Sequence, residues 1–401
     1  MAVIRGRQFF QNPGPTNIPD RILRAMNRPA IDFVQTDFRA VVDECVDGLK
    51  YALKTKGTIV VYTASGHGAW EGALVNTLSP GDRVLVCDSG YFALHWAAMA
   101  KAHGVEAEIL PGDWRKGVDP AAVEARLRAD TARDIRAVLL VHNETSTGVA
   151  NRAADIRRAM DAAGHPALYM IDTISSLMSF DFRMDEWGVD VAVGGSQKGM
   201  MLPAGMSFNG ISGKALAATQ SARCARAYWD WRNLLTDGRQ TGFSGTAAVH
   251  LWFGLQESVR MIREEGTDAI FARHHRLAEA VRRAIAAWSA DGGPQLYASD
   301  PRVISDSASA VLMPEGHDAE AVRRACMDRF NVSIGGGLGE LSGRVFRIGH
   351  LGDLNEPMIL GTIASVEAAL RVAKVPHGQG GTAAAIAYLA ETPQPGEETA
   401  A

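Results

Sequence analysis

Short β-branched runs alternate with helical patterns between residues 58 and 211, and this alternation constrains the fold of the chain more than any other feature. The spacing predicts strands at 58–64, 82–88, 105–110, 135–142, 166–172, 189–195 and 206–211. It predicts intervening helices at 69–78, 90–103, 119–130 and 153–163. Strands joined through helices of this length form βαβ units. We therefore expect an α/β fold built on a mainly parallel sheet.

The rest of the chain predicts a second, smaller unit with a mixed pattern. A chain of 401 residues exceeds one ordinary hydrophobic core, so two domains are expected. We expect an N-terminal arm (1–20), a large α/β domain (21–266), a smaller C-terminal α+β domain (267–376) and a C-terminal tail (377–401). The composition of the tail allows a helix at 382–391, and the end of the tail is expected to be disordered.

Composition excludes several classes of function. The net charge is −4 and no long run has one sign, which argues against a nucleic-acid or membrane surface. The four cysteines are widely separated, and no His, Asp and Glu set has the spacing of metal ligands, so no disulfide framework or metal site is expected. No apolar run approaches 18 residues, and the expected location is cytoplasmic.

Polar clusters follow the predicted strands at the ends where each strand finishes. They are Ser65 to His67, His142 to Thr147, Asp172, and Gln197 with Lys198. In parallel sheets, ligands bind beyond the carboxyl ends of the strands. Clusters on one edge are difficult to explain by packing alone, so the sequence predicts a ligand site there.

Lys198 follows an apolar strand and the pair Gly194-Gly195. Taken alone, a lysine in a glycine-rich loop is most often a surface residue. A lysine that is partly buried needs a partner or a chemical role, because its ammonium group is strongly hydrated. The role that fits best is covalent: an amine in a low-dielectric pocket, with a lowered pKa, that forms a Schiff base.

Together these clusters describe a pyridoxal-phosphate site. Asp172 can hold the proton on the pyridine nitrogen, and Ser65 to His67 can offer N–H groups and a helix N-terminus to the phosphate. Phe92 or Tyr91 offers an aromatic plane for the ring. Arg347, expected at the end of a strand in the small domain, suits a substrate carboxylate.

The chain resembles the class V aminotransferases of fold type I, and among them the serine–glyoxylate and alanine–glyoxylate group. The residues that carry the resemblance, in order from residue 13 to residue 352, are PGPTNIP, SGHGAWEGALVNTLSPGD, HNETSTGV, IDTISS, DEWGVDVAVGGSQKGMMLPAG and FRIGHLG. The resemblance implies a large domain with a seven-stranded, mainly parallel sheet sandwiched by helices, and pyridoxal 5'-phosphate as the cofactor.

The resemblance also implies a role for each matching residue near the cofactor. Lys198 would be the Schiff-base lysine and proton shuttle, and Asp172 would pair with the ring nitrogen. Ile174 and Phe92 would cover the two ring faces, and Thr145 would contact the ring oxygen. The phosphate would be bound by Ser65, Gly66, His67 and Gln197.

Substrates and assembly are implied in the same way. Arg347, with Gly14, would bind the carboxylate of an amino acid or 2-oxo acid. Such enzymes are homodimers whose active site lies at the subunit interface, and Thr246 would reach the partner's phosphate. Related sequences usually carry an aromatic residue before this threonine and a proline after it, whereas this chain has Gly245 and Ala247. Phe243, or the aromatic stretch 228–231, could compensate.

We therefore expect a ping-pong aminotransferase that moves the amino group of a small donor, L-serine, to glyoxylate, giving hydroxypyruvate and glycine. Alanine, aspartate or a ureidoglycine donor is the alternative. A lyase or desulfurase with the same cofactor is less well supported, since no loop cysteine precedes FRIGHLG, and a non-enzymatic cofactor-binding protein would be expected to lack Arg347. A serine hydrolase is disfavoured because GFSGT lacks the last glycine of GxSxG.

Several polar and aromatic residues have a second, structural interpretation. His67 could be a capping residue, and His142 and His350 are expected to be packed core histidines. Glu144 is either a general acid or base or a hydrogen-bonding residue of its turn. The stretch 228–231 is more typical of packing or of a dimer contact than of a substrate pocket.

Overall fold

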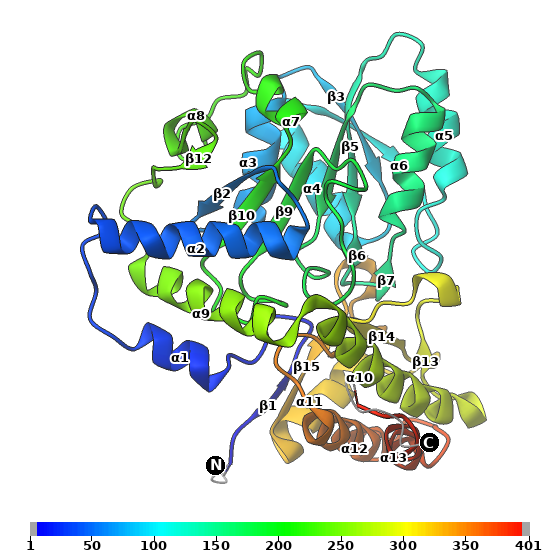
Figure 1. Ribbon diagram of the computed structural model, residues 1–401. Coiled ribbons are helices and arrows are strands. Elements are labelled where there is room, and N and C mark those ends of the chain that lie inside the picture. The colour runs from blue at the N-terminus through cyan, green and yellow to red at the C-terminus, as the bar shows by residue number, and fades with distance from the viewer. Residues whose placement is uncertain (1–5, 395–401) are drawn as a thin grey trace, which may run out of the picture.

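The computed structural model describes residues 6–394, which form a large domain around a seven-stranded sheet and a smaller one around a second sheet (Figure 1). The strand order in the larger sheet is β2-β10-β9-β8-β5-β3-β4. Its strands are β2 (Thr58–Tyr62), β3 (Arg83–Cys87), β4 (Glu106–Leu110), β5 (Ile135–Val141), β8 (Leu168–Asp172), β9 (Val191–Gly195) and β10 (Ser207–Ile211). Only β10 runs antiparallel to its neighbours in this sheet. The predicted seven-stranded, mainly parallel sheet is confirmed.

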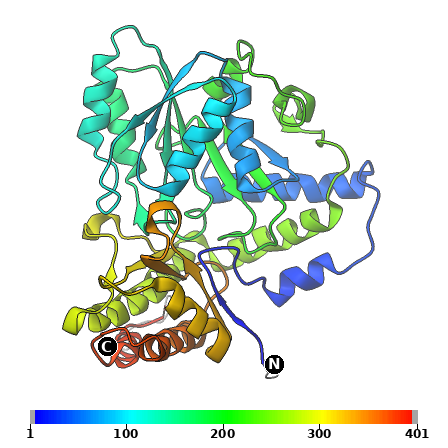
Figure 2. The same cartoon turned by 180° about the vertical axis from the view of Figure 1, so that it is seen from behind.

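Helices cover both faces of the large sheet (Figures 1 and 2). One face packs against α2 (Thr36–Leu53), α5 (Pro120–Ala129), α6 (Ala153–Ala162) and α9 (Val249–Glu265). The other packs against α3 (Gly66–Thr77), α4 (Tyr91–Ala102) and α7 (Gly213–Ala218). Alternate residues of one strand supply the two cores, since Ile59 and Val61 join the first and Val60 and Tyr62 the second.

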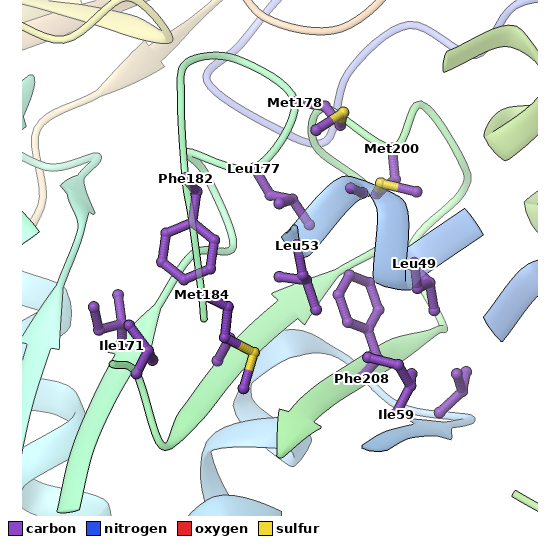
Figure 3. Close-up of a cluster of buried hydrophobic side chains, with 14 of the residues drawn as sticks. Leu49, Leu53, Ile59, Ile171, Leu177, Met178, Phe182, Met184, Met200 and Phe208 are labelled. Carbon is purple, nitrogen blue, oxygen red and sulfur yellow. The ribbon is translucent and has the colours of Figure 1, made fainter. Parts of the chain in front are cut away.

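The core beneath α2 also holds the long connection between β8 and β9 (Figure 3). Leu49 and Leu53 of α2 meet Phe208 of β10, while Phe182 and Met184 of the connection are buried against the same core. Each such side chain contributes about 1.5–3 kcal/mol when it is fully buried. This packing fixes the segment that joins Asp172 to Lys198.

The second sheet has the order β1-β15-β16-β14-β13 and carries the C-terminal helices on it. Its strands are β1 (Phe9–Gln11), β13 (Gln295–Leu296), β14 (Ala308–Leu312), β15 (Val332–Gly336) and β16 (Val345–Gly349). The helices are α10 (Thr267–Trp288), α11 (Ala319–Phe330), α12 (Glu356–Val372) and α13 (Gly381–Glu391). The smaller α+β domain is confirmed, and the N-terminal arm supplies its edge strand, since β1 pairs with β15 in parallel.

Short elements complete the described chain. They are α1 (Asp20–Met26), α8 (Trp231–Leu234), the pairs β6 (Asn143–Glu144) with β7 (Val149–Ala150) and β11 (Leu235–Thr236) with β12 (Arg239–Gln240), and 3₁₀ turns at Ala290–Gly292, Pro301–Val303 and Gly339–Leu341. No helix within residues 6–394 is long and apolar enough to cross a membrane. Residues 1–5 of the predicted arm and 395–401, where the disordered end was expected, lie outside the described residues.

Two elements differ from the sequence-based expectation. Helix α3 begins at Gly66 and not at Ala69, because glycine is tolerated in a first turn whose N–H groups need no partner inside the helix. Arg347 lies at the centre of β16, so its predicted place at a strand end is wrong. The strand tolerates the arginine because the opposite residue of β15 is Gly335, which leaves room for its side chain.

Candidate active site

The N-terminal arm is bonded to the segment that carries Lys198. The backbone N–H of Thr16 donates to the carbonyl of Gln197 (3.0 Å), and the Thr16 hydroxyl donates to the carbonyl of Lys198 (3.2 Å). Because β1 precedes this arm in the second sheet, the arm joins the small domain to the carboxyl edge of the large sheet.

Lys198 is buried, with 9% of its surface exposed. Its Nζ donates to the carbonyl of Pro13. Burial lowers the pKa of Lys198 to about 7, the positive charge of Arg347 lowers it further, and Asp172 opposes the shift. A large fraction of the amine is therefore uncharged near neutral pH, which is the form that attacks a carbonyl.

Gly14 leaves the space that the Lys198 side chain occupies. A Cβ at this position would overlap the Cδ, Cε and Nζ atoms of the lysine. Its φ of +103° also lies in the region that favours glycine. Only glycine permits this close approach of the arm to the amine.

Asp172 ends β8 in a fully buried position with both carboxylate oxygens bonded. Oδ1 accepts from the backbone N–H of Ile174 (2.6 Å), and Oδ2 accepts from the indole N–H of Trp70 (2.9 Å). Burial raises the pKa of Asp172 to about 7, against the effect of these two donors. Among charged neighbours, Glu144 raises the pKa and Lys198 lowers it.

The predicted phosphate cradle lies at the open N-terminus of α3. No side chain caps this helix at Ser65. Gly66 lies directly under Ile174, whose side chain a Cβ there would strike. The Oε1 atom of Gln197 is buried without a hydrogen-bond partner among the described residues, and His67 is exposed with one ring face near Trp70. Free N–H groups at a helix N-terminus suit an anion.

Thr145 is held by the connection that follows β8, and Phe92 is held by Glu144 of β6. The Thr145 hydroxyl donates to Ser175 Oγ (2.7 Å). Glu144 is fully buried and accepts from the backbone N–H groups of Phe92 (3.1 Å) and Ala93 (3.2 Å). Glu144 therefore caps α4 and sets the position of Phe92. This hydrogen bonding is the structural one of the two roles that the sequence allowed for Glu144.

Arg347 connects the two domains from the middle of β16. Its Nε donates to the carbonyl of Gly336 (2.7 Å) and its Nη1 to the carbonyl of Thr145 (3.1 Å), while Nη2 has no partner within residues 6–394. Burial lowers the pKa of Arg347 to about 10, so the guanidinium stays cationic at neutral pH. A buried cation with free donors suits a carboxylate.

One predicted residue lies apart from the others. Thr246 is exposed on the loop before α9, and its side chain makes no hydrogen bond in the part of the chain that is described. Phe243 on the same loop packs on Phe38 (6.0 Å between ring centres) and Trp252 (5.9 Å). The predicted role of Thr246 on a partner's phosphate stays a prediction.

His142 and His350 are buried core histidines, and the stretch 228–231 is partly buried, with Tyr228 42% exposed. His142 is bonded to Ser176 Oγ (2.9 Å) among aromatic rings, and burial lowers its pKa to about 3. His350 is bonded to Ser309 Oγ (3.0 Å). In the stretch 228–231, Trp231 is buried and donates to the hydroxyl of Tyr62 (2.5 Å).

Sequence reasoning missed Trp70 and Ser175. Trp70 stands one helical turn after Gly66, and this spacing was the one signal that pointed to the site. Ser175 accepts from Thr145 and from Asn143 (2.8 Å), and nothing in the sequence distinguishes it from its neighbour Ser176.

The residues present fit pyridoxal 5'-phosphate. They provide a buried amine, a buried carboxylate with a lone pair to spare and an uncapped helix N-terminus. Lys198 would hold the aldehyde carbon, Asp172 the ring nitrogen, and the α3 N-terminus the phosphate.

Comparisons with known proteins identify the family of the chain. The family model for aminotransferase class-V matches residues 8–340. L-aspartate–glyoxylate aminotransferase of Paracoccus denitrificans is 42% identical over 97% of this chain and 98% of its own length. Serine–glyoxylate aminotransferase of Methylorubrum extorquens is 43% identical over 98% of this chain and 99% of its own length.

Among solved structures, ureidoglycine–glyoxylate aminotransferase from Bacillus subtilis superposes with a TM-score of 0.89. It is 24% identical, and the match covers 98% of this chain and 100% of that one, which is a likeness of fold. The family match spans most of the chain, and the two relatives are aligned over nearly their whole length. The chain therefore belongs to the class V aminotransferases and is a pyridoxal-phosphate-dependent enzyme.

Proposed function

We propose that this enzyme transfers the amino group of L-serine to glyoxylate, giving hydroxypyruvate and glycine, by a ping-pong mechanism. Similarity supports glyoxylate as the acceptor, because both curated relatives described above carry glyoxylate in their names. Similarity does not separate the donors, since the two relatives are 42% and 43% identical.

The observation that favours a donor with one carboxylate, such as serine, over aspartate is the supply of free cationic donors at the site. Arg347 has an unpartnered Nη2 and suits one carboxylate. The neighbouring Arg323 is already bonded to Glu320 and to the carbonyl of Ile334 (3.0 Å). Serine has a single carboxylate, whereas aspartate has a second one that would need another free cation.

When bound, the cofactor supplies an electrophilic carbon and an electron-accepting ring. Arg347 orients the substrate carboxylate, and the carbonyl of Thr145 keeps the guanidinium in place. Lys198 Nζ takes the proton from the substrate Cα and returns it later, a task for which a pKa of about 7 is suited. Asp172 would pair with the ring nitrogen through a charge-assisted hydrogen bond.

Aspartate is the second candidate donor, because Arg323 lies close enough to Arg347 to lower the pKa of its guanidinium. Release of Arg323 from Glu320 would provide the second cation. A cysteine-dependent reaction on the same fold is not supported, since Cys45, Cys87, Cys224 and Cys326 are all buried.

A donor panel tests the proposal. Purified enzyme is given L-serine, L-aspartate or L-alanine with glyoxylate, and kcat/KM is measured for each donor. We expect serine to exceed aspartate by at least about ten-fold, because an unpaired carboxylate in a buried site costs more than 1 kcal/mol. Equal or faster turnover with aspartate would overturn serine as the donor, and no transfer to glyoxylate from any donor would overturn the proposal as a whole.

A further inference from the structure

Trp70 links the predicted ring-nitrogen partner to the predicted phosphate site. It lies on α3, the helix whose N-terminus forms the cradle, and it is fully buried. Its indole N–H donates to Asp172 Oδ2 at 2.9 Å. The other carboxylate oxygen is bonded to the backbone of Ile174, so each oxygen of Asp172 has one fixed donor from a different element.

The indole ring of Trp70 is also the centre of an aromatic group. It stacks on Trp96 of α4, with ring centres 5.7 Å apart and planes at 14°. Its ring centre lies 4.5 Å from that of His67 and 6.3 Å from that of Phe92. One side chain therefore contacts the cradle, the predicted stacking residue and the carboxylate of β8.

Packing alone does not require the indole N–H. Trp96 is equally buried in the same stack, and its Nε1 has no hydrogen-bond partner among the described residues. The two tryptophans thus share one stack and the same burial, but Trp70 alone of the two donates a hydrogen bond from its indole, to Asp172. A bond to a buried carboxylate is stronger than one between neutral groups, and loss of its donor leaves the acceptor unpaired.

We propose that Trp70 is a positioning residue: its indole N–H fixes the orientation of the Asp172 carboxylate and holds it at a set distance from the N-terminus of α3. The cofactor ring and its phosphate are then bound by one rigid unit. This inference rests on the proposed role of Asp172 as the partner of the ring nitrogen.

The test compares Trp70→Phe with Trp96→Phe. Both variants lose an indole from the same stack and keep an aromatic ring, so the loss of packing is matched between them. Cofactor affinity is measured by absorbance titration of the cofactor-free enzyme. We expect Trp70→Phe to bind pyridoxal phosphate about ten-fold more weakly, because an unpaired carboxylate reorients, and Trp96→Phe to stay within about two-fold of the wild type.

A second measurement needs no cofactor. In cofactor-free enzyme labelled with ¹⁵N at tryptophan, the indole signal that disappears in Trp70→Phe should shift with pH near 7, where Asp172 titrates. Glu144 and Lys198 are the other charged groups acting on this carboxyl, and His67 packs on the indole itself, so Asp172→Asn is the control that assigns the shift to Asp172. The signal that disappears in Trp96→Phe should not shift. If Trp70→Phe does not fold, Asp172→Asn identifies the same signal, because its shift is abolished.

Equal loss of affinity in the two variants, or a Trp70 signal that is constant across this pH range, would overturn the positioning role. Failure of the proposed role of Asp172 would give a different pair of results in the two measurements. A wild-type enzyme that binds no pyridoxal phosphate would remove the role of Asp172 towards the ring, while the indole titration would still report the bond between the two side chains.

Discussion

The reactivity of this site comes from the burial of three charged side chains in one place. Water would stabilise the charge on Lys198, Asp172 and Arg347, and each is at most 9% exposed. Burial lowers the pKa of Lys198 to about 7, and it raises the pKa of Asp172 to about 7. The arginine retains its charge, so the site combines a fixed cation with two groups that exchange protons near neutral pH.

Gly14→Ala tests how closely the arm approaches Lys198. We expect the variant to lose most of its cofactor incorporation, because the new Cβ would overlap the lysine side chain. Gly81→Ala is the matched control, since Gly81 also has a positive φ (+87°) but nothing lies within 4 Å of its Cβ position. Both variants should lose about 1 kcal/mol of stability from the backbone conformation. Equal cofactor incorporation in both would contradict the close approach.

For single residues, the sequence predicted which residue types form the site, but it did not predict the contacts between them. A lysine, an aspartate and a glycine-rich turn after successive strands pointed to one edge of the sheet, and the structure brings them together there. The carbonyl of Pro13 and the indole of Trp70 were missed, because their roles depend on how the arm and α3 pack against the site.

At the scale of single elements, most bounds followed from hydrophobic periodicity, and errors occurred where glycine or arginine broke the pattern. Helix α3 starts three residues early because two glycines disguised its first turn. The central position of Arg347 in β16 was not visible, since it depends on Gly335 in the strand opposite. Sequence periodicity reports the environment of one face and not the identity of the neighbouring strand.

The C-terminal helix α13 is an integral part of the small domain, although the sequence suggested a tail. Its N-terminus is capped by Glu367, which accepts from the backbone N–H groups of Gly380 (3.0 Å) and Thr382 (2.8 Å). Arg276 of α10 donates to the carbonyl of Leu389 (2.8 Å). The alanine-rich composition gave little periodicity to indicate which face of this helix is buried.

Leu389→Ala should therefore lower the free energy of unfolding by about 2–4 kcal/mol, because it leaves a cavity where the side chain is 8% exposed. Ile386→Ala in the same helix is the control. Its side chain is 50% exposed, and the expected change is below about 1 kcal/mol. Chemical denaturation of both variants measures the difference, and similar values for the two would show that α13 does not dock as described.

At the scale of the whole molecule, the site is assembled from three parts of the chain that are distant in sequence. The large sheet positions Asp172 and Lys198, the small domain delivers Arg347, and the N-terminal arm closes over the lysine from the edge of the second sheet. The βαβ alternation predicted the first part. The docking of the arm as strand β1 could not be predicted, since three residues carry too little pattern to identify a partner strand.

The central claim is that Lys198 is the residue to which the cofactor is attached. Borohydride reduction of the holoenzyme followed by peptide mapping measures this directly. We predict one pyridoxyl group per chain, on Lys198, because other lysines such as Lys54 and Lys214 are paired with Asp181 and Asp190 and lie nearer to solvent. A label on another lysine, or no label at all, would contradict the account.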